Sequence, residues 1–211
     1  MDIEPPAIIR TQIVHSLSAH RRGAEMERRS ARRQRAVYRI AHVETRCDNG
    51  LARVVDISDD GVGLKLHMPV MLGDNVTVHL TEHLTVAGRV VWTAGADCGL
   101  QLDNPIDSDA LLREFGARPR AQAQRPPRIA IDQPAVARSE AGVRKVQVRD
   151  VSQHGMKVLH DGSFTEGLRV KVTLSSGTER RGVVRWSSDG IAGLILLEPF
   201  TTAELGSAKN L

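Results

Sequence analysis

A carboxylate, a hydroxyl and a glycine stand at fixed spacing in the segment Asp56-Ile-Ser58-Asp-Asp-Gly61. Successive side chains of a β-strand point to opposite faces, so Asp56 and Ser58, two residues apart at the end of a predicted strand, project from the same face. Together they can accept and donate hydrogen bonds to the polar edge of a ring, while Gly61 lets the chain turn or lets a ligand approach the backbone. Taken alone, the pattern also fits an Asx-type turn that closes a hairpin.

Two arginines, Arg29 and Arg33, stand four residues apart just before the first predicted strand. Guanidinium groups form bidentate hydrogen bonds with phosphates and with the O6 and N7 atoms of guanine, and they stack flat on purines. An arginine segment beside an Asp/Ser face is therefore suited to an anionic guanine nucleotide. A solvated basic tail is the simpler alternative for such a run. Arg35 and Arg39 also have this spacing, but they fall on the predicted strand and are expected to face solvent.

The positive charge of the chain is concentrated in one segment. The 211 residues include 29 Lys or Arg and 25 Asp or Glu, a net charge of only +4. Residues 21–39 hold eight arginines against two glutamates, so the rest of the chain is close to neutral. A basic segment of this kind suggests an anionic partner, whereas the small number of aromatic residues argues against rows of stacked bases.

Composition excludes several classes of protein. A hydrophobic content of 41% with 26% charged residues is typical of globular domains and argues against general disorder. No run of about 18 apolar residues is present, so no membrane insertion is expected. The N-terminus does not resemble a signal peptide, and the two cysteines form no disulfide framework. A cytoplasmic location is expected.

The chain contains an internal duplication. A shift of 94 residues aligns 56–105 with 150–199 without gaps and gives 14 identities in 50 positions. The only two tryptophans, Trp92 and Trp186, coincide in this alignment. Chance matching of common residues does not readily pair them, so the duplication is taken as real. Their place in apolar strands predicts that they pack in the barrel core or between domains.

Each copy has the pattern of a small β-barrel. Short, largely alternating Val/Leu-rich segments are separated by turn residues at spacings of about 8–12 residues. In the first copy the predicted strands are 35–46, 51–57, 62–67, 75–80, 84–92 and 98–102, with Cys47-Asp48-Asn49-Gly50 as a hairpin turn. In the second copy the pattern recurs through 143–151, 155–160, 169–174, 180–186 and 191–197. The fold expected is all-β, with two six-stranded antiparallel barrels in tandem, each followed by a short helix.

The segments around the two copies define the domain organisation. Asp107-Ser-Asp followed by an apolar stretch and Gly116 predicts a short capped helix after the first copy. Residues 117–127 are rich in Pro, Ala, Gln and Arg and are predicted to be a linker. The expected division is a flexible N-terminal segment 1–27, a first domain 28–116, the linker 117–127 and a second domain 128–211.

The Arg29-Ser-Ala-Arg-Arg33 motif, followed 23 residues later by Asp56-Ile-Ser58-Asp-Asp-Gly61 on a six-stranded barrel, resembles the PilZ domain of bacteria. The resemblance covers about residues 28–115. It implies a receptor for the second messenger cyclic di-GMP, in which Arg29 and Arg33 hold the phosphates and guanine faces. It further implies that Asp56 and Ser58 contact guanine and that Gly61 keeps the surface open. Arg28, directly before the motif, matches a position that in the family favours an intercalated pair of ligand molecules.

The second copy departs from this pattern. Asp150-Val-Ser152-Gln-His-Gly155 is intact, but the position 22 residues before Asp150 is Arg128, and Gln124 stands four residues earlier. One arginine of the pair is therefore missing in register. The second copy is interpreted as a degenerate PilZ domain that serves as a scaffold or partner surface rather than as a second high-affinity site.

Other candidate motifs carry little weight. His79-Leu-Thr-Glu-His83 has a spacing that metal ligands use, but the surrounding valines predict a strand ending in a turn, so exposed histidines and no metal site are expected. No catalytic motif, phosphate loop or dinucleotide fingerprint is present, so no enzyme, no catalytic residue and no cofactor are expected.

The functional hypothesis is a cyclic di-GMP receptor that transmits binding as a conformational change to an unidentified protein partner, with the machinery of motility or of exopolysaccharide production as examples from the family. One alternative is a nucleic-acid-binding basic protein, although no recognition-helix pattern supports specific binding of nucleic acid. The other alternative is a protein-interaction module in which both sites bind no ligand.

Overall fold

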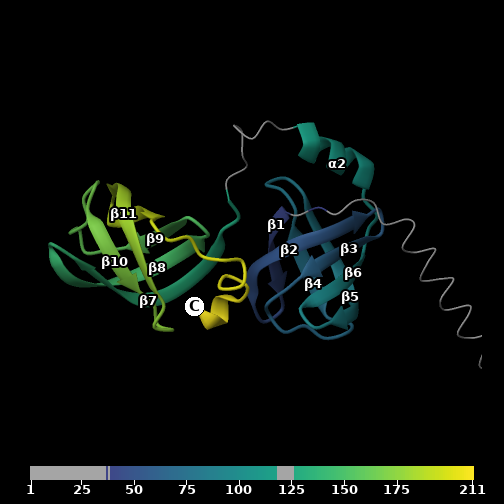
Figure 1. Ribbon diagram of the computed structural model, residues 1–211, viewed down its shortest axis with the longest axis horizontal. Coiled ribbons are helices and arrows are strands. Elements are labelled where there is room, and N and C mark those ends of the chain that lie inside the picture. Colours follow the sequence, from purple (N-terminus) through teal and green to yellow (C-terminus); the bar gives the residue numbers. More distant parts are fainter. Residues whose placement is uncertain (1–36, 38, 118–125) are drawn as a thin grey trace, which may run out of the picture. The chain divides into compact units, whose positions relative to one another are not determined.

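The computed structural model describes residue 37 and residues 39–117 and 126–211, and these residues form two closed six-stranded antiparallel barrels (Figure 1). The first barrel comprises β1 (Arg39–Thr45), β2 (Asn49–Ser58), β3 (Gly61–Lys65), β4 (Asn75–His79), β5 (Thr85–Ala94) and β6 (Asp97–Leu102). The second comprises β7 (Ile129–Ser139), β8 (Gly142–Ser152), β9 (Gly155–Leu159), β10 (Arg169–Thr173), β11 (Glu179–Ser188) and β12 (Ile191–Leu196). The predicted all-β fold of two six-stranded barrels is confirmed.

Both barrels have the same strand order. Around the first barrel it is β1-β2-β3-β6-β5-β4, closed by pairing of β4 with β1, and the second barrel repeats it as β7-β8-β9-β12-β11-β10. Closure satisfies the backbone hydrogen-bonding groups that an open sheet would leave at its edges. None of the helices formed by the described residues is long and apolar enough to cross a membrane.

Alternating side chains give each barrel its own hydrophobic core. In β4, Val76 and Val78 are at most 1% exposed, whereas Thr77 between them is only half-buried. In β10, Val170 and Val172 occupy the equivalent places and are also buried. Valine suits these positions because its β-branched side chain packs well on a pleated surface. Period-two alternation therefore explains why this apolar content folds into barrels.

One β-bulge in each copy interrupts the alternation at a position that matters for the outer surface. The register of β2 against β3 shifts between Val54 and Asp56, and that of β8 against β9 shifts between Val148 and Asp150. Val54 and Ile57 are both buried in the core, although they are three residues apart. An unbroken strand would point Asp56 inward with Val54, so the bulge places Asp56 on the outer face.

The first hairpin turns earlier than the sequence predicts. Asn49 and Gly50 pair with Glu44 and Val43 inside the ladder of β1 and β2, so the prediction that Asn-Gly forms the turn is wrong. Asp48 and Thr45 close the turn instead, because the Thr45 N–H donates to the Asp48 carbonyl at 2.8 Å and the Thr45 hydroxyl donates to the same oxygen at 2.9 Å. Side-chain hydrogen bonding by Thr45 thus replaces the turn that Asn-Gly would supply.

A short helix follows each barrel, although the two differ. After the first barrel, α2 (Ser108–Ala117) begins where the Asp107 carboxylate accepts from the Ala110 N–H at 2.8 Å, which confirms the predicted capped helix. The Arg39 guanidinium lies 4.1 Å from the ring centre of Phe115 in α2, so Arg39 forms a cation–π contact rather than the expected solvent-facing side chain. After the second barrel there is one turn of 3-10 helix, η2 (Ala208–Asn210).

The strand β7, which contains Pro134, is one that the sequence pattern did not predict. Proline cannot donate to a β-ladder, which normally argues against a central strand. β7 pairs with β8 over most of its length, but with β10 only through residues 136–138. Pro134 is paired with Gln147 of β8 and lies where β7 has no partner on its β10 side, an edge position at which strands tolerate proline.

The two cysteines are expected to differ strongly in reactivity. Cys47 is exposed, whereas Cys98 is buried in the first core at 1% exposure. Burial, with a smaller contribution from Asp97, raises the pKa of Cys98 to about 11. Because the thiolate is the nucleophile, a pKa two units higher lowers the reactive fraction about 100-fold near pH 8, and burial slows the reaction further. Iodoacetamide should thus give a singly alkylated native protein at Cys47, checked by peptide mass spectrometry; equal labelling of both thiols would contradict this.

Candidate functional site

Asp56, Ser58 and Gly61 lie together on the hairpin of β2 and β3. Asp56 pairs with Gly63 and Ser58 pairs with Gly61, and the Ser58 hydroxyl donates to the Gly61 carbonyl at 3.3 Å. Both Asp56 and Ser58 are partly buried and lie on the outer face, since Ile57 between them is fully buried. The prediction that the carboxylate and the hydroxyl share one face of a strand end is confirmed.

Two glycines and a tryptophan extend this surface across four strands. Asp56 on β2 pairs with Gly63 on β3, Gly63 with Gly99 on β6, and Gly99 with Trp92 on β5. A Cβ at Gly63 would lie 2.7 Å from the Asp56 carboxylate, and one at Gly99 would lie 2.0 Å from Trp92 Nε1. Glycine at these two positions leaves room for the carboxylate in its present position at one end of the row and for the indole at the other.

Sequence reasoning missed Gly63 and Gly99 as parts of the surface. Gly99 was visible as one of the identities in the duplication, and Gly63 as a place where the two copies differ. Their importance depends on strand register, because residues 36 apart become neighbours only when β3 pairs with β6.

The tryptophans lie outside the barrel cores, so the prediction that they pack in the core is wrong. Trp186 is 45% exposed and its indole covers Gly193, as that of Trp92 covers Gly99. The cause is a second bulge, since the register shifts between Val90 and Trp92 in β5 and at the equivalent place in β11. The extra residue in each bulge turns the following tryptophan to the outer face of the barrel, where its indole offers a flat surface for stacking.

The acidic turn between β2 and β3 is hydrogen-bonded to the rest of the first domain. The Asp59 carboxylate accepts from the Ser108 hydroxyl at 2.6 Å and from the Ser108 N–H at 3.1 Å, and the Asp60 carbonyl accepts from the Leu102 N–H at 2.9 Å. These contacts tie the turn to the start of α2 and to the end of β6. The turn that follows Ser58 is therefore held rigidly, which fixes the position of the hydroxyl.

The arginines assigned to the ligand, Arg28, Arg29 and Arg33, lie outside the described residues. The structure therefore bears on the barrel side of the site only.

The second barrel reproduces the hairpin but changes its electrostatics. The Ser152 hydroxyl donates to the Gly155 carbonyl at 3.3 Å, as Ser58 does to Gly61. Asp150, however, pairs with Lys157, which occupies the place of Gly63, and Lys157 Nζ lies 3.0 Å from Asp150 Oδ2. Arg128 Nη1 is ion-paired with the other oxygen, Asp150 Oδ1. Both oxygens of this carboxylate, whose side chain is 15% exposed, are thus held by cations within the chain.

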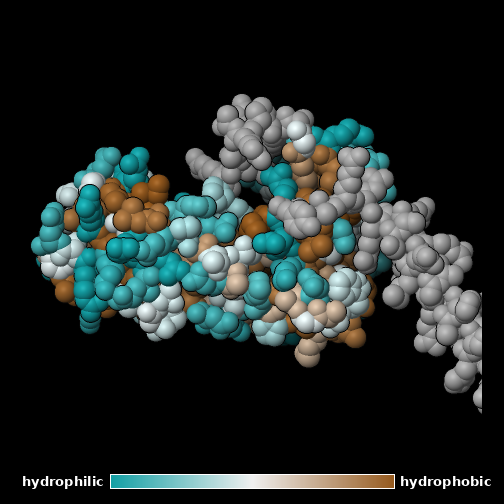
Figure 2. Space-filling model, in the orientation of Figure 1, coloured by the Kyte–Doolittle hydropathy of each residue, from teal (hydrophilic) through white to brown (hydrophobic). Residues whose placement is uncertain are grey.

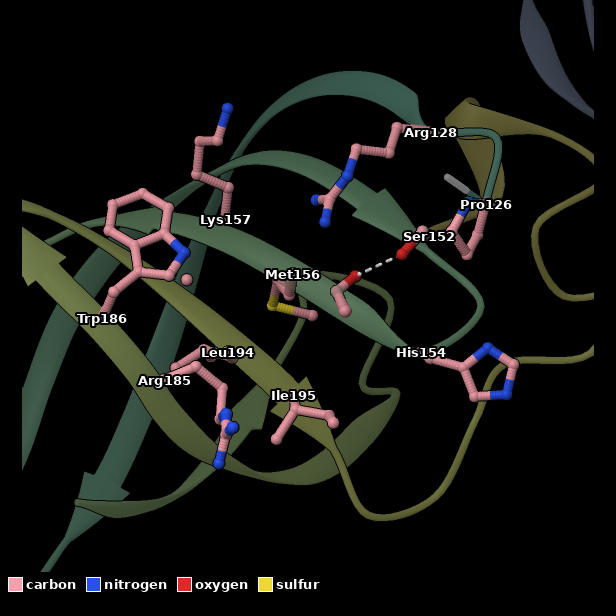
Figure 3. Close-up of a pocket in the computed structure, with 12 residues that line it drawn as sticks. Pro126, Arg128, Ser152, His154, Met156, Lys157, Arg185, Trp186, Leu194 and Ile195 are labelled. Carbon is pink, nitrogen blue, oxygen red and sulfur yellow. Dashed lines mark hydrogen bonds between the residues drawn. The ribbon is translucent and has the colours of Figure 1, made fainter. Parts of the chain in front are cut away.

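A cavity of about 250 Å³ opens on this face of the second barrel (Figure 3). Figure 3 shows Arg128, Lys157 and Trp186 along its rim, with Met156 and Leu194 between the strands. Figure 2 shows a hydrophobic group over the part of the second barrel that Figure 1 labels β9 and β11, within an otherwise mostly hydrophilic visible face. The surface combines cations with apolar area, as protein-contact surfaces often do.

Two six-stranded barrels in tandem, each with an Asp and a Ser on the hairpin of its second and third strands, define the architecture of the chain. The chain belongs to the PilZ domain family, because the model of that family matches residues 27–116 and again residues 119–199. No curated protein matches the sequence.

Three bacterial proteins are among the solved structures that match this chain. The PlzA protein of Borreliella burgdorferi in complex with c-di-GMP is 11% identical, with 74% of this chain and 79% of that chain covered and a TM-score of 0.30. The Bacillus subtilis inhibitor of motility, MotI/DgrA, is 15% identical, with 78% and 90% covered and a TM-score of 0.30. YcgR of Escherichia coli in complex with c-di-GMP is 13% identical, with 85% and 80% covered and a TM-score of 0.29.

Proposed function

We propose that the protein is a non-enzymatic receptor for cyclic di-GMP and that its first barrel binds the ligand. Asp56 and Ser58 would contact a guanine edge. Gly61 and Gly63 have no side chains that would occupy the space beside it. Arg28, Arg29 and Arg33, from the segment before β1, would supply the guanidinium groups for the phosphates and the purine faces. The ligand carries two phosphates and two guanines, and this set of side chains offers a complement to both.

The difference between Gly63 and Lys157 is the observation that carries the assignment to the first barrel. Beside Asp56 the chain places a glycine, whereas beside Asp150 it places a lysine whose ammonium holds the carboxylate. Lys157 and Arg128 hold both oxygens of Asp150, and the Lys157 side chain covers surface that glycine leaves uncovered at the equivalent place in the first barrel. Lys157 and Arg128 therefore disfavour the same mode of binding in the second barrel.

The second barrel is proposed to act as a scaffold or partner surface. Its cavity of about 250 Å³ is smaller than the roughly 300–1,000 Å³ typical of small-molecule sites. Trp186 and Ile195 at this cavity are each 45% exposed, and exposed apolar groups of this kind favour contact with another protein. Transmission to a protein partner would follow from a conformation whose affinity for that partner depends on ligand occupancy.

A bacterial cytoplasmic setting fits the state of the thiols. Both cysteines of the chain are free, with one exposed and one buried. Free thiols persist in a reducing compartment, which is also where a nucleotide second messenger acts on its receptors.

Single substitutions on each side of the site are expected to remove binding. Ser58→Ala removes a hydroxyl, and Arg33→Ala removes a guanidinium group. Each should weaken cyclic di-GMP binding by about 10-fold or more, as measured by titration calorimetry of the full chain. Arg128→Ala, in the second barrel, is the control and should leave the affinity unchanged. Absence of heat with the wild-type protein would overturn the receptor assignment.

The nucleic-acid alternative is separated from the receptor by salt dependence. A protein that binds duplex DNA through the arginines of residues 21–39 would lose affinity steeply, with the logarithm of affinity falling by about 0.9 per neutralised phosphate for each tenfold rise in salt. Tight binding of duplex DNA with this slope, together with no binding of cyclic di-GMP, would favour the alternative. If the protein bound neither cyclic di-GMP nor duplex DNA, the protein-interaction module would be favoured.

A further inference from the structure

Two histidines and a glutamate gather on the first barrel away from the proposed nucleotide surface. His42 and Glu44 lie on the outer face of β1, and His79 lies on β4 directly opposite His42 in the ladder. The row from Asp56 to Trp92 crosses β2, β3, β6 and β5, so this cluster occupies the two remaining strands of the barrel. The nitrogen and oxygen atoms that the three side chains offer lie within 4.8 Å of one another.

Hydrogen bonds orient both imidazole rings toward the glutamate. His42 Nε2 lies 3.3 Å from Asn49 Oδ1, an acceptor; in the tautomer with the ring proton on Nε2, the lone pair of Nδ1 is left for the cluster. His79 Nδ1 lies 3.0 Å from the Thr85 hydroxyl, which can accept the ring proton in the same way. Metal-binding histidines usually have their outer nitrogen held by such a second partner.

The inward nitrogens converge on one carboxylate oxygen. Glu44 Oε1 lies 3.3 Å from His79 Nε2 and 3.6 Å from His42 Nδ1. His79 Nε2 is shielded from solvent and makes no hydrogen bond, although the carboxylate is so close. Donor atoms around a tetrahedral ion with bonds of 2.0–2.1 Å are about 3.3 Å apart, so these separations match those of a metal site.

We propose that His42, Glu44 and His79 bind a divalent transition-metal ion, with zinc as the best match. Two imidazoles and a carboxylate suit zinc better than magnesium or calcium, which prefer oxygen ligands. Three protein ligands leave one position for water. The rings now stack with centroids 5.0 Å apart and 20° between their planes, so binding requires rotation about χ2 until both lone pairs meet at one point.

This site differs from the histidine pair that the sequence brings to attention. His79 and His83 are four residues apart, but His83 lies beyond the end of β4, in the exposed turn before β5. His42 becomes the partner of His79 only through the closing pairing of β1 with β4. An ion held there would link the two strands that close the barrel.

The proposal is tested on the full-length, metal-free protein by calorimetry with Zn²⁺ and by visible absorption with Co²⁺. We expect one tight equivalent of metal and the absorption bands of a tetrahedral cobalt site. His42→Gln, His79→Gln and Glu44→Gln should each weaken this equivalent by at least about 100-fold, whereas the matched control His83→Gln should leave it unchanged. Thr85→Val, which removes the contact of a positioning residue, should weaken it about 10- to 100-fold.

The glutamate variant keeps the test independent of folding, because the Glu44 side chain is 48% exposed and its loss creates no buried cavity. No tight equivalent in the wild-type protein, or an equivalent that survives His42→Gln and His79→Gln, would overturn the proposal. The outcome does not depend on whether the protein binds cyclic di-GMP.

Discussion

Replacing Gly63 with lysine is expected to lower the affinity for cyclic di-GMP by at least about 100-fold, equivalent to roughly 2.7 kcal/mol of binding free energy. The reason lies in the second barrel, where Lys157 at the matching place holds Asp150 at 3.0 Å. A lysine at 63 would bind Asp56 in the same way. Its side chain would also occupy the space above the sheet between Asp56 and Gly99. The ligand would then lose a charged acceptor and the space beside it.

The barrel is expected to tolerate this change. A Cβ at position 63 conflicts with the present position of the Asp56 carboxylate, but the second barrel accommodates a Cβ at residue 157 beside an aspartate in the same register. Thermal unfolding should therefore change little, and titration calorimetry measures the loss of affinity on folded protein.

Lys157→Gly is the matched control for Gly63→Lys. It removes one of the two cations that hold Asp150, but Arg128 still holds this carboxylate and one arginine of the pair is missing before the second copy, so the affinity and the stoichiometry should stay unchanged. If Lys157→Gly abolished binding and Gly63→Lys did not, the ligand would bind to the second barrel instead of the first.

Phe200→Ala is expected to destabilise the second barrel by about 3–5 kcal/mol, the usual cost of removing a buried phenylalanine. Phe200 is 1% exposed, and its N–H donates to the Gln153 carbonyl at 2.8 Å, next to the hairpin of β8 and β9. The Arg180 guanidinium lies 4.2 Å from its ring centre and would lose this contact too. Calorimetric unfolding of the full chain, compared between variant and wild type, measures the cost.

The duplication supplies a control for Phe200. Ile106 stands at the equivalent place after the first barrel, where its N–H donates to the Asp59 carbonyl at 2.8 Å, but its side chain is only partly buried. Ile106→Ala should therefore cost less than about 2 kcal/mol. A cost for Phe200→Ala no greater than that for Ile106→Ala would show that the ring does not anchor the second barrel.

The difference between the two nucleotide surfaces could be foreseen only in part. The loss of one arginine before the second copy is visible in the sequence, and it led to the interpretation of that copy as degenerate. The role of Lys157 is not visible, because a lysine seven residues after an aspartate indicates no contact by itself. The contact arises because β8 and β9 pair with a bulge at Asp150, which sets the two side chains opposite each other.

The arginine segment of residues 21–39 and the Asp-x-Ser-x-x-Gly motif were recognised from the sequence alone, as were the duplication and the all-β architecture. These features depend on residue type and on spacing along one strand or turn. Such local patterns are visible in the sequence without knowledge of which strands pair. The row from Asp56 through Gly63 and Gly99 to Trp92, the outward tryptophans and the cluster of His42, Glu44 and His79 were decided by the tertiary structure. Each of them depends on which strands pair and in which register, and bulges that add one residue to a strand change that register and turn side chains to the other face.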